Sequence, residues 1–278
     1  MTALDLEAEY NNRARVPEHP GIIAGWKESA AAFRAAHVNA ELGIAYGPSA
    51  RQTLDIFWPD EARDAPLALF IHGGYWQALD PSLFSHLAKA ANTNGVALAL
   101  CGYDLCPQVQ LAEIIEQLRA STLFLWKRHR RKIVACGHSA GGHLTACLLA
   151  TDWKKYDASA PEDLVPSGLS ISGLFDLTPL VPTTINHALQ LDEAEAARNS
   201  PLHWGLSGKR VLDAWVGGAE SSEYLRQGRT VTDAWKKRGV ETAYREIAGA
   251  NHFTVLDPLK DAGSQISQRL AALAHALR

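Results

Sequence analysis

Apolar residues along the chain gather in short runs, and these runs predict eight β-strands. Several runs are rich in Val, Ile, Leu and Ala without alternating polar residues, which is typical of strands buried on both faces. The predicted strands are Leu42–Tyr46, Leu54–Trp58, Leu67–His72, Val96–Tyr103, Ile133–Gly137, Gly168–Ser172, Val211–Gly217 and Ala243–Ile247. The first two have short connections, which favours an antiparallel edge of the sheet.

Helical patterns separate most of these strands. They cover Pro81–Asn94, Leu111–His129, Ala140–Thr151, Ser222–Arg238 and Ala262–Leu277. Strands that alternate with helices indicate parallel strands joined by crossovers, and therefore a twisted, doubly wound α/β sheet with helices on both faces. The sequence has no internal repeat and no low-complexity linker, so we predict one domain over residues 1–278.

Two segments depart from this alternation. The irregular stretch of residues 174–208 is long for a simple connection, and long loops in compact domains often form lids. We therefore predict a short cap over the active site there. Residues 1–38 are predicted to form two helical pieces around Trp26 that pack over the same rim.

Composition excludes several classes of protein. Hydrophobic residues at 47% and charged residues at 21% describe a soluble globular protein. The net charge of −3 provides no basic surface for nucleic acid. No stretch reaches the roughly 18 apolar residues that a membrane span needs, and the polar, acidic start does not resemble a signal peptide. Four cysteines without paired metal spacing indicate buried, reduced thiols in a cytoplasmic protein (Cys101, Cys106, Cys136 and Cys147).

A candidate nucleophile follows the fifth predicted strand. Residues 137–141 read G-H-S-A-G, a G-x-S-x-G motif between a strand and a helix. A serine at such a sharp turn is held in a strained backbone that lifts its hydroxyl out of the sheet. The flanking glycines are needed because a Cβ would clash where strand and helix nearly touch. We predict Ser139 as the nucleophile; a tight glycine turn with an idle serine is the plain structural alternative.

A candidate oxyanion hole follows the third predicted strand, where residues 72–76 read H-G-G-Y-W. Hydrolysis of an ester or amide creates a tetrahedral oxyanion that needs preorganised N–H donors. A Gly-Gly loop lets the backbone approach the substrate closely. The predicted donors are the backbone amides of Gly74, Tyr75 and Ala140, with Gly73 as a substitute.

In serine hydrolases built on such a sheet, the catalytic residues follow one another along the chain in the order serine, acid, histidine. The acid and the base are therefore expected after the last strands. His252 lies in the loop that leaves the final strand and is the predicted base. Glu220 lies in the turn after the strand before it and is the predicted acid. Glu223 and Asp213 remain alternatives. His72 is expected to brace the glycine loop.

Together these motifs resemble the kynurenine formamidase (arylformamidase) branch of the α/β-hydrolase superfamily, near the hormone-sensitive-lipase-like esterases. The branch is distinguished by H-G-G-x-W, which here ends at Trp76. Further matching stretches are residues 10–13 (YNNR), Val16-Pro17, 137–144 (GHSAGGHL), 172–177 (SGLFDL), 216–227 (VGGAESSEYLRQ) and His252-Phe253. The family usually has Asp where this chain has Glu220.

The resemblance implies an α/β-hydrolase fold and hydrolysis of N-formyl-kynurenine to kynurenine and formate, without cofactor or metal. The aryl leaving group would need an apolar pocket, for which the candidates are Tyr75, Trp76, Phe175, Asn186 and Trp204. The alternatives are a carboxylesterase acting on short-chain or aryl esters, and a non-catalytic protein of this fold that binds a small molecule. The expected partner is a small-molecule substrate, and the assembly is left open, with a homodimer among the alternatives.

Overall fold

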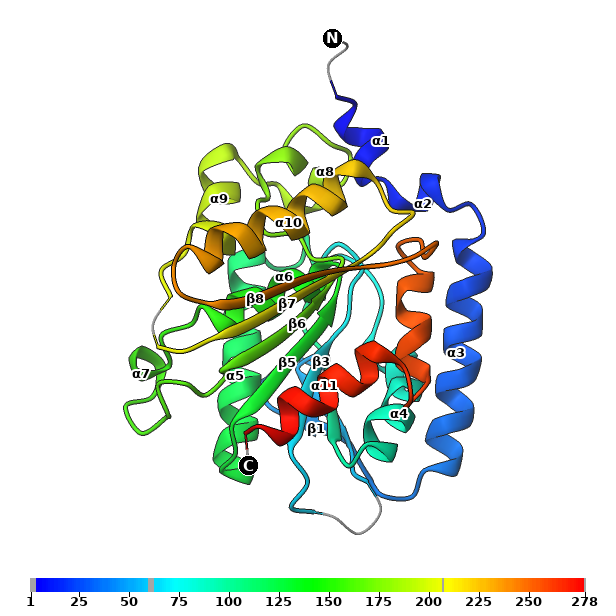
Figure 1. Cartoon of the computed structure of the whole chain (residues 1–278), viewed down its shortest axis with the longest axis vertical. Helices are drawn as coiled ribbons and strands as arrows, with labels where there is room; N and C mark the ends of the chain where they lie inside the picture. Colours follow the sequence, from blue (N-terminus) through cyan, green and yellow to red (C-terminus); the bar gives the residue numbers. More distant parts are fainter. Residues whose placement is uncertain (1–3, 60–62, 207, 278) are drawn as a thin grey trace.

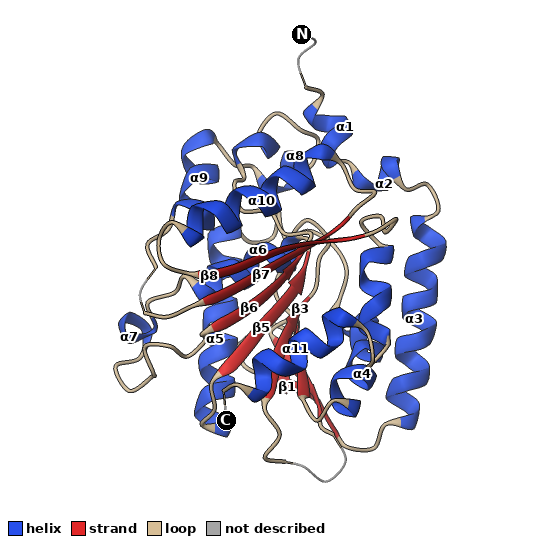
Figure 2. Ribbon diagram, viewed as in Figure 1, coloured by secondary structure: helices blue, strands red, loops and turns tan. Residues whose placement is uncertain are grey.

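A single eight-stranded sheet forms the centre of the protein (Figures 1 and 2). The computed structural model describes residues 4–59, 63–206 and 208–277. The strands are β1 (Ala40–Ala45), β2 (Thr53–Phe57), β3 (Leu67–Ile71), β4 (Ala97–Cys101), β5 (Ile133–His138), β6 (Ser167–Ile171), β7 (Val211–Gly217) and β8 (Glu241–Ile247). All eight predicted strands are confirmed, and each end lies within two residues of its predicted position.

The order of the strands determines where a ligand is expected to bind at the edge of the sheet. The order is β1-β2-β4-β3-β5-β6-β7-β8. β1 pairs antiparallel with β2, as predicted, and β2 pairs antiparallel with β4, whereas all other neighbours are parallel. From β3 the chain continues to β4 on one side and later to β5 on the other. Ligands of such sheets bind beyond the carboxyl ends of the strands at this change of direction, here after β3 and β5.

The helices follow the predicted order. The longer ones are α3 (His19–Ala36), α5 (Leu111–His129), α6 (Ala140–Leu149), α10 (Ser222–Lys236) and α11 (Gln265–His275). The predicted helix 81–94 begins as a 3-10 helix, η1 (Pro81–Leu87), and continues as α4 (Ala88–Thr93). Another 3-10 helix, η4 (Thr254–Lys260), precedes α11, and α7 (Trp153–Tyr156) precedes β6. None of the described helices is long and apolar enough to cross a membrane.

The expectation of two helical pieces around Trp26 was wrong. Trp26 lies inside the single helix α3 and is buried. Its ring packs on Phe84 of η1 with a centroid distance of 5.3 Å. This contact explains how α3 tolerates Gly21 and Gly25, since tertiary packing overrides weak helix propensity. Two shorter helices, α1 (Leu6–Tyr10) and α2 (Asn12–Arg15), precede α3.

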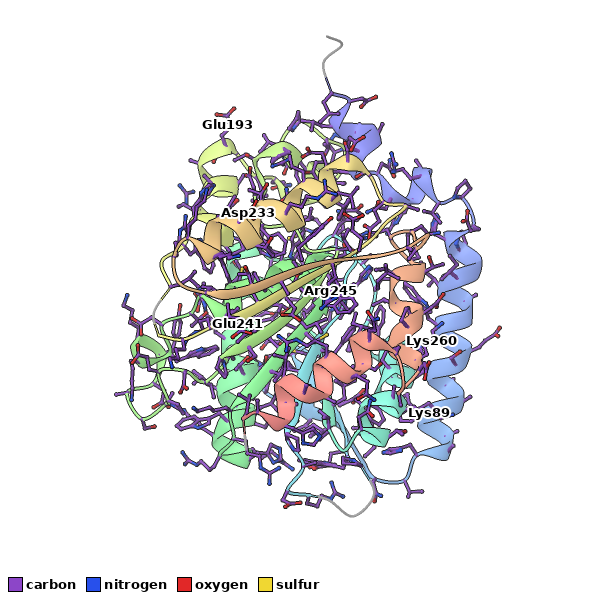
Figure 3. All side chains as sticks on the ribbon, in the orientation of Figure 1. Lys89, Glu193, Asp233, Glu241, Arg245 and Lys260 are labelled. Carbon is purple, nitrogen blue, oxygen red and sulfur yellow. The ribbon has the colours of Figure 1, made fainter. Side chains whose placement is uncertain are left out.

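Side chains of each strand alternate between two apolar layers. On β3, Leu67, Leu69 and Ile71 face the layer that includes α5, α6 and α10. Ala68 and Phe70 face the layer formed with α3, α4 and α11. Charged residues such as Glu193 and Asp233 lie on the exposed faces of outer helices (Figure 3). The inner strands are therefore buried on both sides, as their sequence predicts, whereas the edge strands β1 and β8 are partly exposed.

Residues 174–206 contain only short helices: η2 (Thr178–Leu180), α8 (Asn186–Leu189), α9 (Glu193–Arg198) and η3 (Pro201–His203). In Figure 1, α8 and α9 lie on the same side of the molecule as α1 and α10. Thr184 joins this segment to α1, because its N–H and hydroxyl donate to the Glu7 carboxylate at 2.8 and 2.7 Å. That the segment caps the active site remains a prediction.

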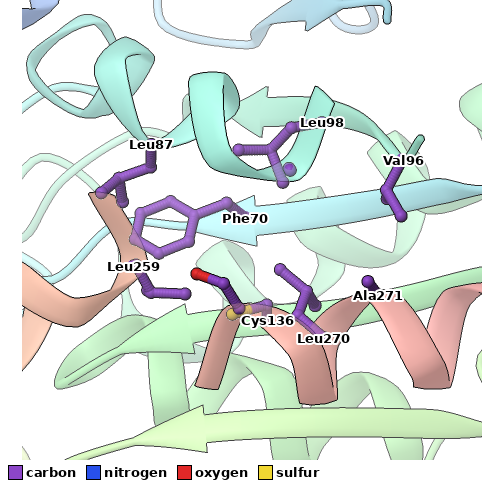
Figure 4. Close-up of a pocket in the computed structure, with 10 residues that line it drawn as sticks. Phe70, Leu87, Val96, Leu98, Cys136, Leu259, Leu270 and Ala271 are labelled. Atoms are coloured by element: carbon purple, nitrogen blue, oxygen red, sulfur yellow. The ribbon is translucent and has the colours of Figure 1, made fainter. Parts of the chain in front are cut away.

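The layer behind β3 is tightly filled. Figure 4 shows Phe70 among Leu87, Leu259 and Leu270. The void that these side chains leave is only about 10 Å³. We therefore expect Phe70→Ala to lower the free energy of unfolding by about 3–5 kcal/mol, measured by urea unfolding followed by tryptophan fluorescence. Leu42→Ala is the control, since Leu42 is 49% exposed, and should change stability by less than about 0.5 kcal/mol. Equal effects of both substitutions would contradict this packing.

Candidate active site

Ser139 forms the whole turn between β5 and α6. β5 ends at His138, α6 begins at Ala140, and Ser139 has φ 58° and ψ −117°. A positive φ is strained for a residue with a side chain. A Cβ on Gly141 would lie 1.9 Å from the Ile71 carbonyl oxygen, so only glycine fits there. The close approach of α6 to the end of β3 thus requires the motif that the sequence carries.

His252 and Glu220 form a buried pair beyond the ends of β8 and β7. Nδ1 of His252 lies 2.6 Å from Oε2 of Glu220, and the two side chains are 5% and 0% exposed. The other carboxylate oxygen, Oε1, accepts hydrogen bonds from the Ser172 hydroxyl at 2.5 Å and the Gly217 N–H at 2.7 Å. Three donors therefore hold the carboxylate so that it fixes the orientation and tautomer of the imidazole.

The alternative acids have other partners. The carboxylate of Glu223 accepts from the Tyr10 hydroxyl at 2.6 Å and forms a bidentate pair with Arg226 at 2.6 and 2.7 Å. Asp213 pairs with Arg269 at 2.7 and 3.1 Å. Of the three carboxylates considered, the structure brings only Glu220 to His252.

His138 holds the loop of His252 against the Ser139 turn. Its Nε2–H donates to the His252 carbonyl at 2.8 Å, and the two ring centroids are 4.8 Å apart. Burial, and then the neighbouring His252, hold the pKa of His138 well below its usual value, so His138 stays neutral. The residue before Ser139 is thereby bonded to the backbone of His252.

Ser139 and His252 are brought to the same place in the fold, but the hydrogen bonds found among the described residues do not include one from Ser139 Oγ to His252 Nε2. Both residues are buried, with exposures of 2% and 4%. In structures without substrate, catalytic hydrogen bonds are often long and tighten only when substrate binds. The arrangement is consistent with a serine, histidine and carboxylate acting in sequence.

The glycine loop after β3 lies directly against Ser139. A Cβ on Gly73 would lie 3.0 Å from the Cβ of Ser139 and 2.9 Å from the His138 carbonyl oxygen. The loop continues with three left-handed residues, Gly74, Tyr75 and Trp76, at φ 113°, 53° and 58°. Such strain in residues with side chains persists only where the surroundings fix the backbone.

His72 fixes the start of this loop. Its ring is fully buried and stacks on Tyr103 with a centroid distance of 4.3 Å. Burial lowers the pKa of His72 to about 4, so the neutral ring donates from Nδ1 to the Gly73 carbonyl at 2.7 Å. The expected bracing role of His72 is confirmed.

The Tyr75 hydroxyl fixes the middle of the loop. It donates to the Tyr10 carbonyl, and it accepts from the Asn12 side-chain amide at 2.8 Å. The Tyr224 hydroxyl lies 3.4 Å away, and the Tyr224 ring packs on His252 with a centroid distance of 4.6 Å. Burial raises the pKa of Tyr75, which keeps its hydroxyl protonated. One buried cluster thus links the N-terminal segment, the glycine loop and the histidine.

Comparisons with known proteins agree with this geometry. A family model described as BD-FAE matches residues 54–179. A kynurenine formamidase from Danio rerio is 30% identical over 229 residues, which cover 79% of this chain and 77% of that protein. One from Salmo salar is 30% identical over 239 residues, covering 82% and 80%. The chain belongs to the kynurenine formamidase family.

Solved structures support the same enzyme class. A structure from Silicibacter sp. TM1040, designated a candidate thioesterase, is 33% identical, covers 98% of this chain and 100% of that chain, and has a TM-score of 0.86. The thermostable carboxylesterase EstE1 has a TM-score of 0.74 at 19% identity, over 93% and 96% of the two chains, and so supports the fold alone. This kynurenine formamidase family member is a hydrolase with the predicted α/β-hydrolase fold, and it acts on a small molecule.

Four of the residues predicted to line the substrate pocket of this family member make packing contacts or hydrogen bonds within the fold. Trp76 is fully buried with its ring edge-on to His143, and Phe175 is buried as well. The Asn186 side chain is bonded to the backbone of Val181 and Leu191. The Trp204 indole N–H donates to the Arg198 carbonyl, and its ring faces Arg119. Their role as pocket residues stays a prediction.

A cavity of about 320 Å³ adjoins His252 and Glu220, and none of those predicted pocket residues lines it. Its lining residues are Asn12, Arg15, Val16, Glu18, Ala219, Glu220, Asn251 and His252. The sequence predicted that residues 1–38 pack over this rim, but none of residues 12–18 was predicted as a site residue. The only signal was the resemblance of residues 10–13 and Val16-Pro17 to the family. In the described part of the chain, no group of three or more His, Cys, Asp or Glu side chains could hold a metal ion.

Tyr75→Phe tests whether the hydroxyl cluster positions the glycine loop. We expect kcat to fall about tenfold and the free energy of unfolding to fall by about 1–3 kcal/mol, because the substitution leaves the Asn12 amide without its buried acceptor. Steady-state kinetics and urea unfolding measure the two effects. The control is Tyr156→Phe in α7, which removes a hydroxyl bonded to Arg119 and Glu116 and should leave kcat unchanged. A destabilised Tyr75→Phe enzyme with wild-type kcat would show that the hydroxyl supports only the fold.

Proposed function

We propose that the protein is an arylformamidase that hydrolyses N-formyl-kynurenine to kynurenine and formate. Ser139 is the nucleophile, His252 the general base and Glu220 the orienting acid. The observation that carries the proposal is the 30% identity to kynurenine formamidases over about four fifths of the chain. The buried His252–Glu220 pair beside the strained Ser139 turn supports it independently.

In the first half of the reaction, Ser139 Oγ attacks the formyl carbon while Nε2 of His252 takes the hydroxyl proton. The formyl oxygen becomes an oxyanion that the backbone amides of Gly74, Tyr75 and Ala140 stabilise. Each such donor contributes about 2.7–4 kcal/mol to transition-state stabilisation. The C–N bond then breaks, and His252 gives its proton to the departing aryl amine.

In the second half, water attacks the formyl ester on Ser139 and gives its proton to His252. The tetrahedral intermediate collapses, the proton returns to Ser139 Oγ, and formate leaves. Glu220 stabilises the imidazolium in both halves and keeps Nδ1 as the donor to the carboxylate. Although glutamate is one methylene longer than aspartate, Oε2 of Glu220 lies within hydrogen-bond distance of Nδ1 of His252, at 2.6 Å.

A second candidate is hydrolysis of short acyl esters or thioesters by the same serine. The candidate thioesterase at 33% identity over the full length of this chain favours it. The same catalytic groups would serve, since all three substrate classes pass through a tetrahedral oxyanion. The candidates differ in the leaving group and in the size of the acyl group that the enzyme must bind.

Steady-state turnover of N-formyl-kynurenine beside p-nitrophenyl acetate separates the two candidates. An arylformamidase should cleave the formamide with kcat/KM of about 10⁵ M⁻¹s⁻¹, within the ordinary range of enzymes. Cleavage of the ester with no detectable cleavage of the formamide would contradict the proposed substrate while leaving the serine hydrolase chemistry intact.

Glu220→Gln should reduce kcat by about 10³–10⁴-fold, because a neutral amide neither fixes the productive tautomer nor stabilises the imidazolium. Glu223→Gln is the matched control. It weakens the contacts to Tyr10 and Arg226 and should lower stability, with kcat within a few-fold of the wild type. Ser139→Ala should abolish turnover. A larger loss of kcat in Glu223→Gln than in Glu220→Gln would overturn the assignment of Glu220 as the acid.

We also propose a cytoplasmic enzyme that needs no cofactor and binds neither nucleic acid nor membrane. The buried, unpaired state of Cys101, Cys106, Cys136 and Cys147 supports a reducing compartment. The net charge of −3 supports the lack of a nucleic-acid surface. A homodimer remains one of the open alternatives for the assembly.

A further inference from the structure

The cavity beside His252 has walls from two parts of the chain that are far apart in sequence. Ala219, Glu220, Asn251 and His252 form one wall, after the ends of β7 and β8. Residues 12–18 of the N-terminal segment form the other. At about 320 Å³ the cavity is within the size range of small-molecule sites, roughly 300–1,000 Å³.

The N-terminal wall is fixed by buried hydrogen bonds. Asn12 donates to the Tyr75 hydroxyl at 2.8 Å, and the Tyr10 hydroxyl donates to Glu223 at 2.6 Å and accepts from Gln227 at 3.0 Å. Tyr10 and Asn12 are 0% and 2% exposed. Residues immediately after them are therefore presented from an anchored backbone, which reduces the entropy lost when they bind a ligand.

Two opposite charges from this wall line the cavity. Arg15 stands at the end of α2, and Glu18 precedes α3. Both are exposed, and neither takes part in the ion pairs found among the described residues. The Arg15 guanidinium makes one hydrogen bond, to the Ala8 carbonyl at 3.4 Å. Both charged groups thus remain available to a ligand in the cavity.

We propose that Arg15 and Glu18 bind the amino-acid end of the substrate, with Arg15 on the α-carboxylate and Glu18 on the α-ammonium. This assignment rests on the proposed function and names the group that selects the substrate. N-formyl-kynurenine carries a zwitterionic amino acid at the end of the molecule remote from the formyl group. A planar guanidinium matches a carboxylate through two parallel hydrogen bonds.

Arg15 and Glu18 each have a local structural environment that a control must separate from ligand binding. Glu18 precedes the first turn of α3, where a carboxylate is also favourable to the helix dipole. Arg15 lies in the last turn of the short helix α2, and its guanidinium makes one long hydrogen bond, to the Ala8 carbonyl at 3.4 Å. Its neighbour Arg13 belongs to the same short helix and is exposed, but it does not line the cavity. Arg13 is therefore a matched control for Arg15.

The test compares N-formyl-kynurenine with N-formyl-kynuramine, which lacks only the carboxylate. For Arg15→Gln, we expect the ratio of kcat/KM for the first substrate to that for the second to fall about tenfold, mainly through KM, as for loss of a charge-assisted hydrogen bond near solvent. Arg13→Gln should keep the wild-type ratio. An unchanged ratio in Arg15→Gln, or an equal fall in Arg13→Gln, would overturn the proposal.

Glu18→Gln is tested in the same way with the substrate analogue that lacks only the α-amino group. We expect the preference for N-formyl-kynurenine over this analogue to fall several-fold. A preference equal to that of the wild type would show that Glu18 does not bind the α-ammonium group. The proposed contact between Arg15 and the α-carboxylate would still be decided by the Arg15→Gln result.

Failure of the proposed function would be recognised separately. If the wild type cleaves p-nitrophenyl acetate but not N-formyl-kynurenine, the proposed function fails. Kynurenine is then tested as an inhibitor of ester hydrolysis. Inhibition that weakens about tenfold in Arg15→Gln but not in Arg13→Gln would keep Arg15 as a carboxylate-binding residue. Absence of inhibition by kynurenine would overturn the inference as well.

Discussion

The backbone passes from β5 into α6 through one residue, and this sharp turn constrains everything around it. Because Ser139 is held at φ 58°, its hydroxyl is raised beyond the ends of the parallel strands. The turn is possible only where α6 can approach the end of β3, and a Cβ on Gly141 would collide with the Ile71 carbonyl. The order of the strands then places the glycine loop after β3 beside the serine.

Around this turn, the proposed catalytic groups are held by buried polar contacts from several loops. The carboxylate of Glu220 has three donors, and His138 ties the loop of His252 to the nucleophile turn. The Tyr75 hydroxyl joins the glycine loop to the N-terminal segment. Buried polar groups without partners are costly, so this network favours a single arrangement of the loops.

The sequence predicted the elements whose signals are local. The eight strands follow from apolar runs, and the sharp turn at Ser139 follows from the glycines that it requires. The contact that separates Glu220 from Glu223 is not local, since both follow β7 and only the fold shows that Glu223 faces Tyr10. That Arg15 lines the cavity was not predicted for the same reason. A polar, exposed segment has no hydrophobic periodicity that would indicate which part of the fold it contacts.

The most direct test of the account is covalent labelling of the wild-type enzyme with a fluorophosphonate, followed by peptide mass mapping. This reagent reacts with serines that a base activates. The account predicts a single adduct on Ser139 and greatly slowed labelling in Glu220→Gln. An adduct on another serine, such as Ser172 beside the same carboxylate, or no adduct in a folded enzyme, would contradict it.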